Sequence, residues 1–208
     1  MQYPKIKTVF KRDPENHYKT LLMGEYSLPE FEYLADCDWL WTEKLDGMNT
    51  RCLWDSHDVA FKGRTDRAQM PVNLMSFLQE TITREKMRGL FGGDNVCVFG
   101  EGYGAGIQKG GKYSDKQKLV LFDINIGGWW LAREDLEGIA NGLGIEIVPI
   151  VATGTLHKLV DCVREGFKSQ WGDFIAEGIV AKPLVALKAR DGSRIITKLK
   201  HSDFAEGK

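Results

Sequence analysis

The sequence lacks the features that mark membrane-spanning, secreted or zinc-stabilised proteins. No apolar run approaches the roughly 20 residues that a helix needs to cross a bilayer, and the opening residues hold no apolar core typical of a signal peptide. The four cysteines form no CxxC pair and have no histidine at zinc-ligand spacing. We therefore expect a cytoplasmic protein with no membrane partner and with reduced core thiols. The cysteines are Cys37, Cys52, Cys97 and Cys162.

A surplus of charge of one sign is also absent. The 28 Lys and Arg residues nearly balance the 29 Asp and Glu residues, so any contact with a polyanion must come from a local basic patch. Repeats, low-complexity stretches and flexible linkers are missing as well. The chain is 43% hydrophobic and 27% charged, which predicts one globular domain over residues 1–208, with no separate C-terminal OB-fold or accessory domain. A monomer is the simplest expectation.

Apolar patterning predicts a mixed fold. Three stretches have helical periodicity: one after Pro71, one at 136–143 that ends at Gly144, and one at 156–163 that ends at Gly166. Because strands outnumber helices and do not alternate with them regularly, we expect an α+β fold with two largely antiparallel β-sheets flanked by helices. The expected strands cover residues 39–43, 50–54, 59–62, 96–101, 119–126, 145–151, 178–182 and 194–200.

A lysine beside an Asp-Gly turn is the densest chemical signal. Lys44 precedes Asp46-Gly47, and the next run carries Asn49 and Arg51. Such a turn alone is usually structural. A lysine nucleophile must be neutral, yet a reference pKa of about 10.4 leaves about one amine in 10³ deprotonated near neutral pH. Lys44 therefore needs cationic neighbours if it reacts.

Two lysines near the other end of the chain can supply those cations. Lys198 and Lys200 point to the same face of a strand because they are two residues apart. If that face lines the cleft of Lys44, both can favour its neutral form and hold phosphates. Alone, the pair would be a solvated edge. Glu101 and Glu177, each at a strand boundary, can serve a metal ion or a ribose hydroxyl beside it.

Six short motifs between residues 40 and 200 resemble, in type and order, those of the covalent nucleotidyltransferases. That superfamily comprises ATP-dependent DNA ligases, RNA ligases and mRNA-capping guanylyltransferases. The Glu43-Lys44 pair and Asn49 look most like the phage-type, nick-sealing RNA ligases. The motifs are Lys44-x-Asp46-Gly47, Gly63-Arg64, Phe99-Gly-Glu101, Phe122-Asp123-Ile124, Glu177-Gly178-Ile179 and Lys198-x-Lys200.

The resemblance implies the nucleotidyltransferase (ligase adenylation domain) fold and an ATP-dependent RNA ligase. Lys44 would attack the α-phosphorus of ATP and pass AMP to a 5′-phosphate end, and a 3′-hydroxyl would displace it. The implied partner is RNA, with DNA or an RNA/DNA hybrid as the alternative. The alternative functions are the catalytic domain of an ATP-dependent DNA ligase and a non-catalytic nucleotide-binding or RNA-binding module of this fold. The implied roles are Glu43 for the adenine edge, Asn49 and Arg64 for the nucleotide and phosphates, Glu101 for the ribose, Phe122 for base stacking, Glu177 for Mg²⁺ or Mn²⁺, and Lys198 and Lys200 for the α-phosphate and leaving group.

A glycine-rich stretch between these motifs invites two other interpretations. Residues 106–112 fit GxxxxGK, but Tyr113 follows where a P-loop has Ser or Thr. We favour a mobile loop that touches a nucleic-acid backbone, with Tyr103 or Tyr113 free to stack on a base; a solvated loop is the alternative. Its lysines are Lys109, Lys112, Lys116 and Lys118. The basic segment 5–12 is either a further contact or a charged edge strand.

Overall fold

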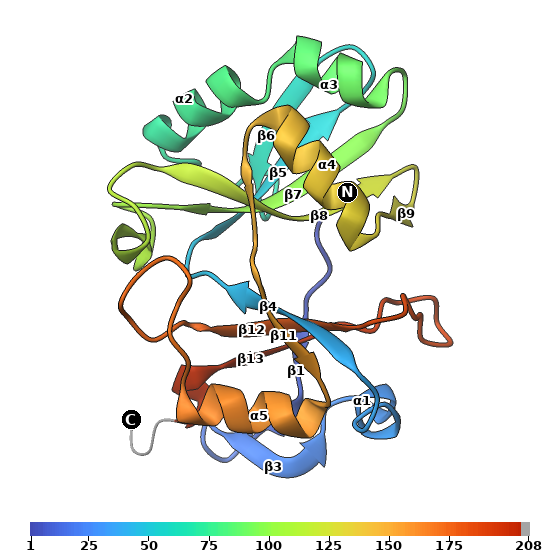
Figure 1. Cartoon of the computed structure of the whole chain (residues 1–208), viewed down its shortest axis with the longest axis vertical. Helices are drawn as coiled ribbons and strands as arrows, with labels where there is room; N and C mark the ends of the chain where they lie inside the picture. Colours follow the sequence, from blue (N-terminus) through green and yellow to red (C-terminus); the bar gives the residue numbers. More distant parts are fainter. Residues whose placement is uncertain (205–208) are drawn as a thin grey trace. The chain divides into compact units, whose positions relative to one another are not determined.

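The computed structural model describes residues 1–204 and divides the chain into two compact units. Unit 1 contains Met1–Pro4 and Leu45–Val148, and unit 2 contains Lys5–Lys44 and the chain from Pro149 onward. Each unit has its own large sheet, its own helices and its own apolar core (Figure 1). The predicted α+β fold with largely antiparallel sheets is confirmed. Within the described chain, no helix is both long and apolar enough to span a bilayer.

Unit 1 is built on a sheet in the order β10-β8-β7-β5-β6, with β9 paired to β8. Only the β10–β8 pair is parallel. The core lies between this sheet and three helices that contribute Leu78, Met87 and Leu143, among others. The elements are β5 (Met48–Trp54), β6 (Val59–Gly63), α2 (Val72–Thr81), α3 (Arg84–Phe91), β7 (Val96–Tyr103), the 3₁₀ turn η1 (Gly110–Lys112), β8 (Lys118–Ile126), β9 (Trp129–Trp130), α4 (Arg133–Leu143) and β10 (Glu146–Ile147).

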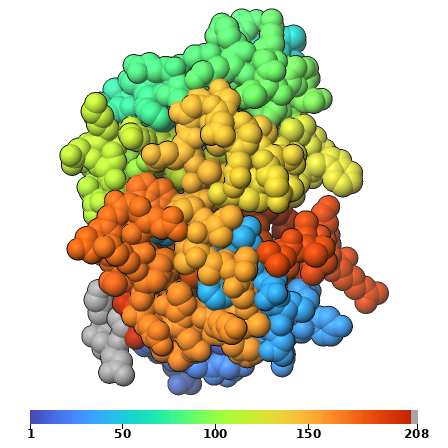
Figure 2. Space-filling view, in the orientation of Figure 1, coloured from blue at the N-terminus to red at the C-terminus, as the bar shows by residue number. Residues whose placement is uncertain are grey.

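Unit 2 has a sheet in the order β1-β13-β12-β4-β11, antiparallel except at β1–β13, and a separate two-stranded ribbon of β2 and β3. Helix α5 packs its apolar side on this core and lies at the surface of its unit (Figure 2). It starts at the Thr155 cap and ends at Gly166, whose φ is +81°. The elements are β1 (Lys7–Thr8), β2 (Phe10–Arg12), β3 (Leu21–Tyr26), α1 (Pro29–Tyr33), β4 (Trp39–Lys44), β11 (Ile150–Gly154), α5 (Leu156–Glu165), β12 (Gly178–Pro183), β13 (Thr197–Lys200) and the 3₁₀ turn η2 (His201–Phe204).

The expected strand 145–151 is wrong as a single element. It is divided into β10 of unit 1 and β11 of unit 2. Pro149 stands between them, and a proline has no N–H to donate to a strand ladder. The chain changes sheets at this residue, so one apolar run serves two cores.

Arg51 is a buried structural residue, only 1% exposed. Its guanidinium donates to the carbonyl oxygens of Gly63 at 2.8 Å and Met1 at 2.7 Å, and to the Asp66 carboxylate at 2.8 Å. The hydrogen bond from Arg51 is the main reason that the pKa of Asp66 is lowered, with the charge of Lys62 adding to it. Arg51 thus ties the first residues of the chain and the end of β6 to the sheet of unit 1.

The cysteines lead to a testable prediction. Cys52 and Cys97 are buried as expected, but Cys37 is exposed and Cys162 is half-buried. Burial raises the pKa of Cys97 to about 11, and it raises the pKa of Cys52 as well. Since the thiolate is the reactive form, Ellman's reagent at pH 8 should titrate one thiol rapidly in the native protein, and Cys37→Ser should remove that phase. Rapid reaction of Cys52 and Cys97 before denaturant is added would contradict this burial.

Candidate active site

Three neighbouring strands of unit 2 place Lys44 and Lys200 in one row. Lys44 of β4 pairs with Gly178 of β12, which also pairs with Lys200 of β13. Residues in register across adjacent strands point to the same face, so both lysine side chains rise on one side of the sheet. Their backbones are about 10 Å apart, two strand spacings, which is within reach of two long side chains that meet between them.

Glu177 joins the two lysines. Its Oε2 lies 2.6 Å from Lys44 Nζ, and its Oε1 lies 2.6 Å from Lys200 Nζ. The side chains of Lys44, Glu177 and Lys200 are 20%, 12% and 35% exposed, so solvent reaches all three. Two ammonium groups and one carboxylate leave a net charge of +1 in this cluster, and that charge favours a phosphate.

Gly178 permits this row to form. A Cβ at Gly178 would lie 2.1 Å from the carbonyl oxygen of Leu199 and 2.8 Å from the Cα of Lys200. Any side chain would therefore push β13, and with it Lys200, away from β12. The glycine of the Glu177-Gly178 motif is explained by this close approach of two backbones.

Lys198 and Lys182 lie on the same face of the sheet. Lys198 pairs with Val180, which pairs with Thr42 two residues before Lys44. Lys182 follows Val180 by two residues and so points to the same side. The structure thus brings Lys44, Lys198 and Lys200 together on one face as predicted. Lys182 is a cation that the sequence analysis left without a role, although the alternation from Gly178 marks it.

Glu43 faces the other way, into the core of unit 2. It is 1% exposed; its Oε1 accepts from the Ser169 hydroxyl at 2.6 Å, and its Oε2 accepts from the Gln170 N–H at 2.9 Å. The carboxylate therefore anchors the loop that follows α5. Its adenine contact stays a prediction. Ser169 and Gln170 were not predicted, because they are more than 120 residues away in sequence.

The anchoring of this loop can be tested by a double-mutant cycle. Glu43→Gln keeps the shape but replaces one acceptor by a donor, and we expect it to lower the free energy of unfolding by about 2 kcal/mol. Ser169→Ala removes one partner and should cost about 1 kcal/mol. Urea unfolding of the double variant should show a loss smaller than the sum, because the two residues share a bond. Strict additivity would mean that this hydrogen bond does not stabilise the protein.

Unit 1 holds the predicted residues Asn49 and Glu101 as a cross-strand pair of β5 and β7. The Asn49 Oδ1 is buried and accepts no hydrogen bond from the described residues. A buried acceptor without a donor is costly and commonly marks a place where a ligand or water binds. Gly47 lies against the same strand: a Cβ there would be 2.3 Å from the Gly102 carbonyl oxygen. The turn after Lys44 is thus closely packed on β7.

Phe122 occupies a β-bulge in unit 1. Phe99 pairs with Asp123 and Gly100 with Leu121, so Phe122 is the extra residue of β8. Bulges re-aim a side chain and are common beside active sites. Tyr3 packs edge-on against Phe122 with ring centroids 5.0 Å apart, and its hydroxyl donates to the buried Asp123 at 2.6 Å. The sequence analysis did not find Tyr3, because one aromatic residue near a terminus is no signal.

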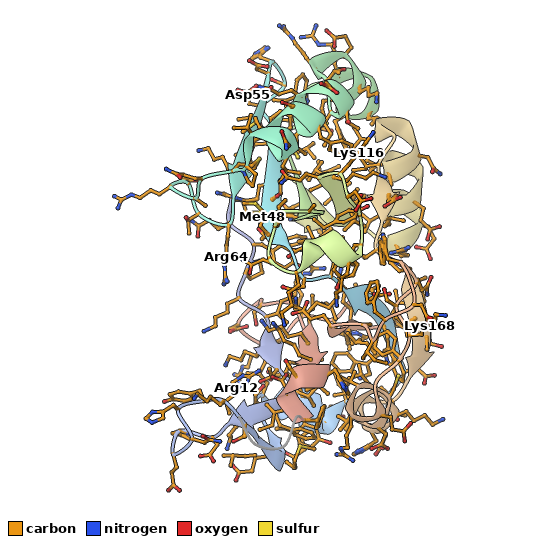
Figure 3. All side chains as sticks on the ribbon, turned by 90° about the vertical axis from the view of Figure 1, so that its left-hand side faces the viewer. Arg12, Met48, Asp55, Arg64, Lys116 and Lys168 are labelled. Carbon is orange, nitrogen blue, oxygen red and sulfur yellow. The ribbon has the colours of Figure 1, made fainter. Side chains whose placement is uncertain are left out.

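The other predictions in unit 1 concern Arg64 and the glycine-rich loop. Arg64 is exposed and follows β6, where Figure 3 labels it. The stacking role suggested for Tyr103 or Tyr113 is wrong, since they are 1% and 7% exposed. The Tyr113 hydroxyl instead accepts from the backbone N–H of Asp46 at 3.3 Å. The glycine-rich loop is packed onto its own unit and includes the turn η1.

The described residues offer a divalent metal a single carboxylate rather than a cluster of ligands. Residues 1–204 contain no group of three or more His, Cys, Asp or Glu side chains that could hold a metal ion. Mg²⁺ commonly binds through one or two carboxylates and completes its shell with phosphate oxygens and water. Glu177, at the centre of the cationic face, is a donor of this kind.

Comparison with known proteins identifies both a family and a fold. A family model described as RNA ligase matches residues 38–200. Solved structures of mutants of the Naegleria gruberi RNA ligase, with ATP and Mn and in an apo state, are similar to this chain at TM-scores of 0.68 and 0.67 and at 19% and 18% identity. The same ligase with PPi gives 0.67 at 19% identity. At this identity the structures establish the fold. The matches cover 96–98% of this chain but only 57–59% of the ligase chains.

Proposed function

This chain belongs to the RNA ligase family, and from that premise we propose that it is an ATP-dependent RNA ligase that carries AMP on Lys44. The observation that carries the proposal is the bridge of Glu177 between Lys44 and Lys200, with Lys198 on the same face. The two ammonium groups, Lys198 beside them and the shared carboxylate give Lys44 a surface that attracts phosphate, which a phosphate-directed nucleophile needs.

The first step is phosphoryl transfer to nitrogen. The Lys44 ammonium loses a proton to water, and the neutral Nζ attacks the α-phosphorus of ATP. A P–N bond forms, the bond from the α-phosphorus to the bridging oxygen breaks, and pyrophosphate leaves with that electron pair. The second proton on nitrogen also passes to water. Catalysis of such a step depends mainly on positioning and on charge neutralisation.

Unit 2 supplies the charges for this step. Lys200 and Lys198 offset the negative charge that builds on the phosphates. Glu177 holds both ammonium groups in place before the nucleotide binds. Mg²⁺ or Mn²⁺, held by Glu177 together with substrate oxygens, would supply further positive charge for the phosphates. Lys182 adds a fourth lysine to this face.

Unit 1 supplies candidates for recognition of the nucleoside. We propose that the unpaired Asn49 Oδ1 accepts a hydrogen bond from the nucleotide, that Glu101 beside it binds the ribose, and that the bulge presents Phe122 to the base. Arg64 would contact the phosphate region. Glu43 would act near the adenine edge mainly through the backbone and loop that its carboxylate fixes.

The receiving substrate is proposed to be RNA with a 5′-phosphate and a 3′-hydroxyl. AMP passes from Lys44 to the 5′-phosphate, and the 3′-hydroxyl then attacks that phosphate and releases AMP. Sealing of nicks whose 3′-hydroxyl strand is either RNA or DNA tests this choice directly. An RNA ligase should join the RNA-ended nick faster; preference for the DNA-ended nick would overturn the RNA assignment.

The adenylylation itself is tested by intact mass after incubation with ATP and Mg²⁺. The wild-type protein should gain the mass of one AMP, and Lys44→Ala should gain none. Lys168→Ala is a matched control, because Lys168 is an exposed lysine of the same unit that pairs with Asp173 at 3.0 Å. A modified Lys44→Ala, or an unmodified wild type, would defeat the proposal.

The role of Lys200 gives a graded prediction. Lys200→Ala should slow adenylylation by about 10²-fold or more, which is typical for loss of one group that stabilises transition-state charge. The bond between Lys44 and Glu177 remains in this variant, so its unfolding midpoint should change little. Quench-flow or timed mass measurements at saturating ATP report the rate. An unchanged rate would show that Lys200 does not act on the phosphates.

A further inference from the structure

The loop between β12 and β13 is an ordered hairpin that extends beyond both strands of unit 2 (Figure 1). The N–H of Leu184 donates to the Asp38 carbonyl oxygen at 3.1 Å where the loop begins. Near the tip, Lys188 forms an antiparallel bridge with Arg194. The Ala189 N–H donates to the Ser193 carbonyl oxygen at 2.8 Å. The backbone of the loop is therefore held by its own hydrogen bonds.

Cations gather on this hairpin. Lys188 and Arg190 are exposed, and Arg194 lies beside Lys188 because paired residues share a face. The single carboxylate of the tip, Asp191, accepts from the Ser193 N–H at 2.9 Å. Hydrogen bonds from Ser193 lower the pKa of Asp191, and the charge of Lys7 adds to this. The local surplus of positive charge contrasts with a chain whose net charge is −1.

The hairpin leads directly into the strand that carries Lys198 and Lys200. Within β13, Lys198 and Lys200 fall on one alternation and buried Thr197 and Leu199 on the other, while the two residues between Arg194 and β13, Ile195 and Ile196, are both buried. Five residues lie between Arg194 and Lys200, so the track spans up to roughly 20 Å. This length suits a few nucleotides of a single strand rather than one phosphate.

Apolar side chains accompany these cations. Leu184, Val185 and Leu187 are 55%, 71% and 38% exposed, on the arm that leads to the tip. In the space-filling view this segment projects from the surface of its unit in orange-red (Figure 2). Exposed apolar residues among Lys and Arg provide contact area for the faces of unpaired bases, while the cations hold the backbone.

We propose that the hairpin 184–194, together with Lys198, forms a binding track for a single RNA strand that leads to Lys44. The proposal rests on RNA as the substrate and deepens it, since it names where the strand is held. Charge complementarity favours a polyanion, and the continuity of the hairpin with β13, which carries Lys198 and Lys200, favours the polyanion whose phosphate end reacts there. A lipid surface is the competing partner, because anionic membranes also attract mixed basic and apolar loops.

The test is the salt dependence of RNA binding. Lys188→Gln with Arg190→Gln removes two exposed charges of the tip, and Arg84→Gln with Arg88→Gln removes two exposed charges of α3 as a matched control. The affinity of a 5′-phosphorylated single-stranded RNA is measured by fluorescence anisotropy over a series of NaCl concentrations. The slope of log K against log salt is negative, and each lost phosphate contact makes it less steep by about 0.7. The slope should become less steep by about 1.4 in the tip variant and should stay unchanged in the control.

Two further measurements separate the possible outcomes. Val185→Ser should weaken RNA binding without changing the slope, because it removes an apolar contact and no charge. Adenylylation by ATP requires no RNA, so the tip variant should form the AMP adduct at the wild-type rate. If the wild-type protein forms no adduct, the ligase proposal fails, and the binding track is not what has been tested. An unchanged slope in the tip variant, or an equal loss in the control, would overturn the track. Loss of binding to phosphatidylserine-containing vesicles with an unchanged RNA slope would assign the hairpin to lipid.

Discussion

One carboxylate between two ammonium groups is the interaction on which the site depends. Lys44 and Lys200 lie in the same row of a sheet and would repel each other without Glu177. The row also requires Gly178, since a Cβ there would meet the backbone of β13. The Glu177-Gly178 dipeptide therefore contributes twice: its first residue balances the charges, and its second lets the strands that carry them come together.

The two faces of β4 have different tasks. Trp39, Trp41 and Glu43 are buried and fix the strand to the core and to the loop at Ser169, while Lys44 stands on the opposite face among other lysines. Stability and chemistry are thus separated by the alternation of one strand. A flexible lysine can react there because the backbone that carries it is held from the other side.

Local patterns in the sequence predicted much of the fold. Helices α4 and α5 have clear apolar periodicity and terminate at Gly144 and Gly166, so both were found. Helix α3 was missed because half of its residues are charged and it buries only Met87 and Phe91. Its one local signal is the single N-cap residue Thr83, and one residue is not enough to predict a helix.

The candidate site was predicted where alternation within a strand carries the information, and missed where distant segments meet. That Lys198 and Lys200 share a face follows from their spacing, whereas their role was implied by the resemblance to the covalent nucleotidyltransferases. Tyr3 on Asp123 and Ser169 on Glu43 link residues more than 100 positions apart, and no local pattern specifies such a pair. The division of 145–151 follows from Pro149, whose missing N–H outweighs the apolar run around it.

The alternation of β4 also limits how this segment can change in length. Inserting or deleting one residue between Trp39 and Lys44 would turn every side chain to the opposite face, placing an ammonium group in the core and a carboxylate among the phosphate-binding lysines. A change of two residues would keep both faces. Length variation before the nucleophile is therefore tolerable only in even steps, a constraint that comes from the geometry of a strand and applies whatever nucleotide is bound.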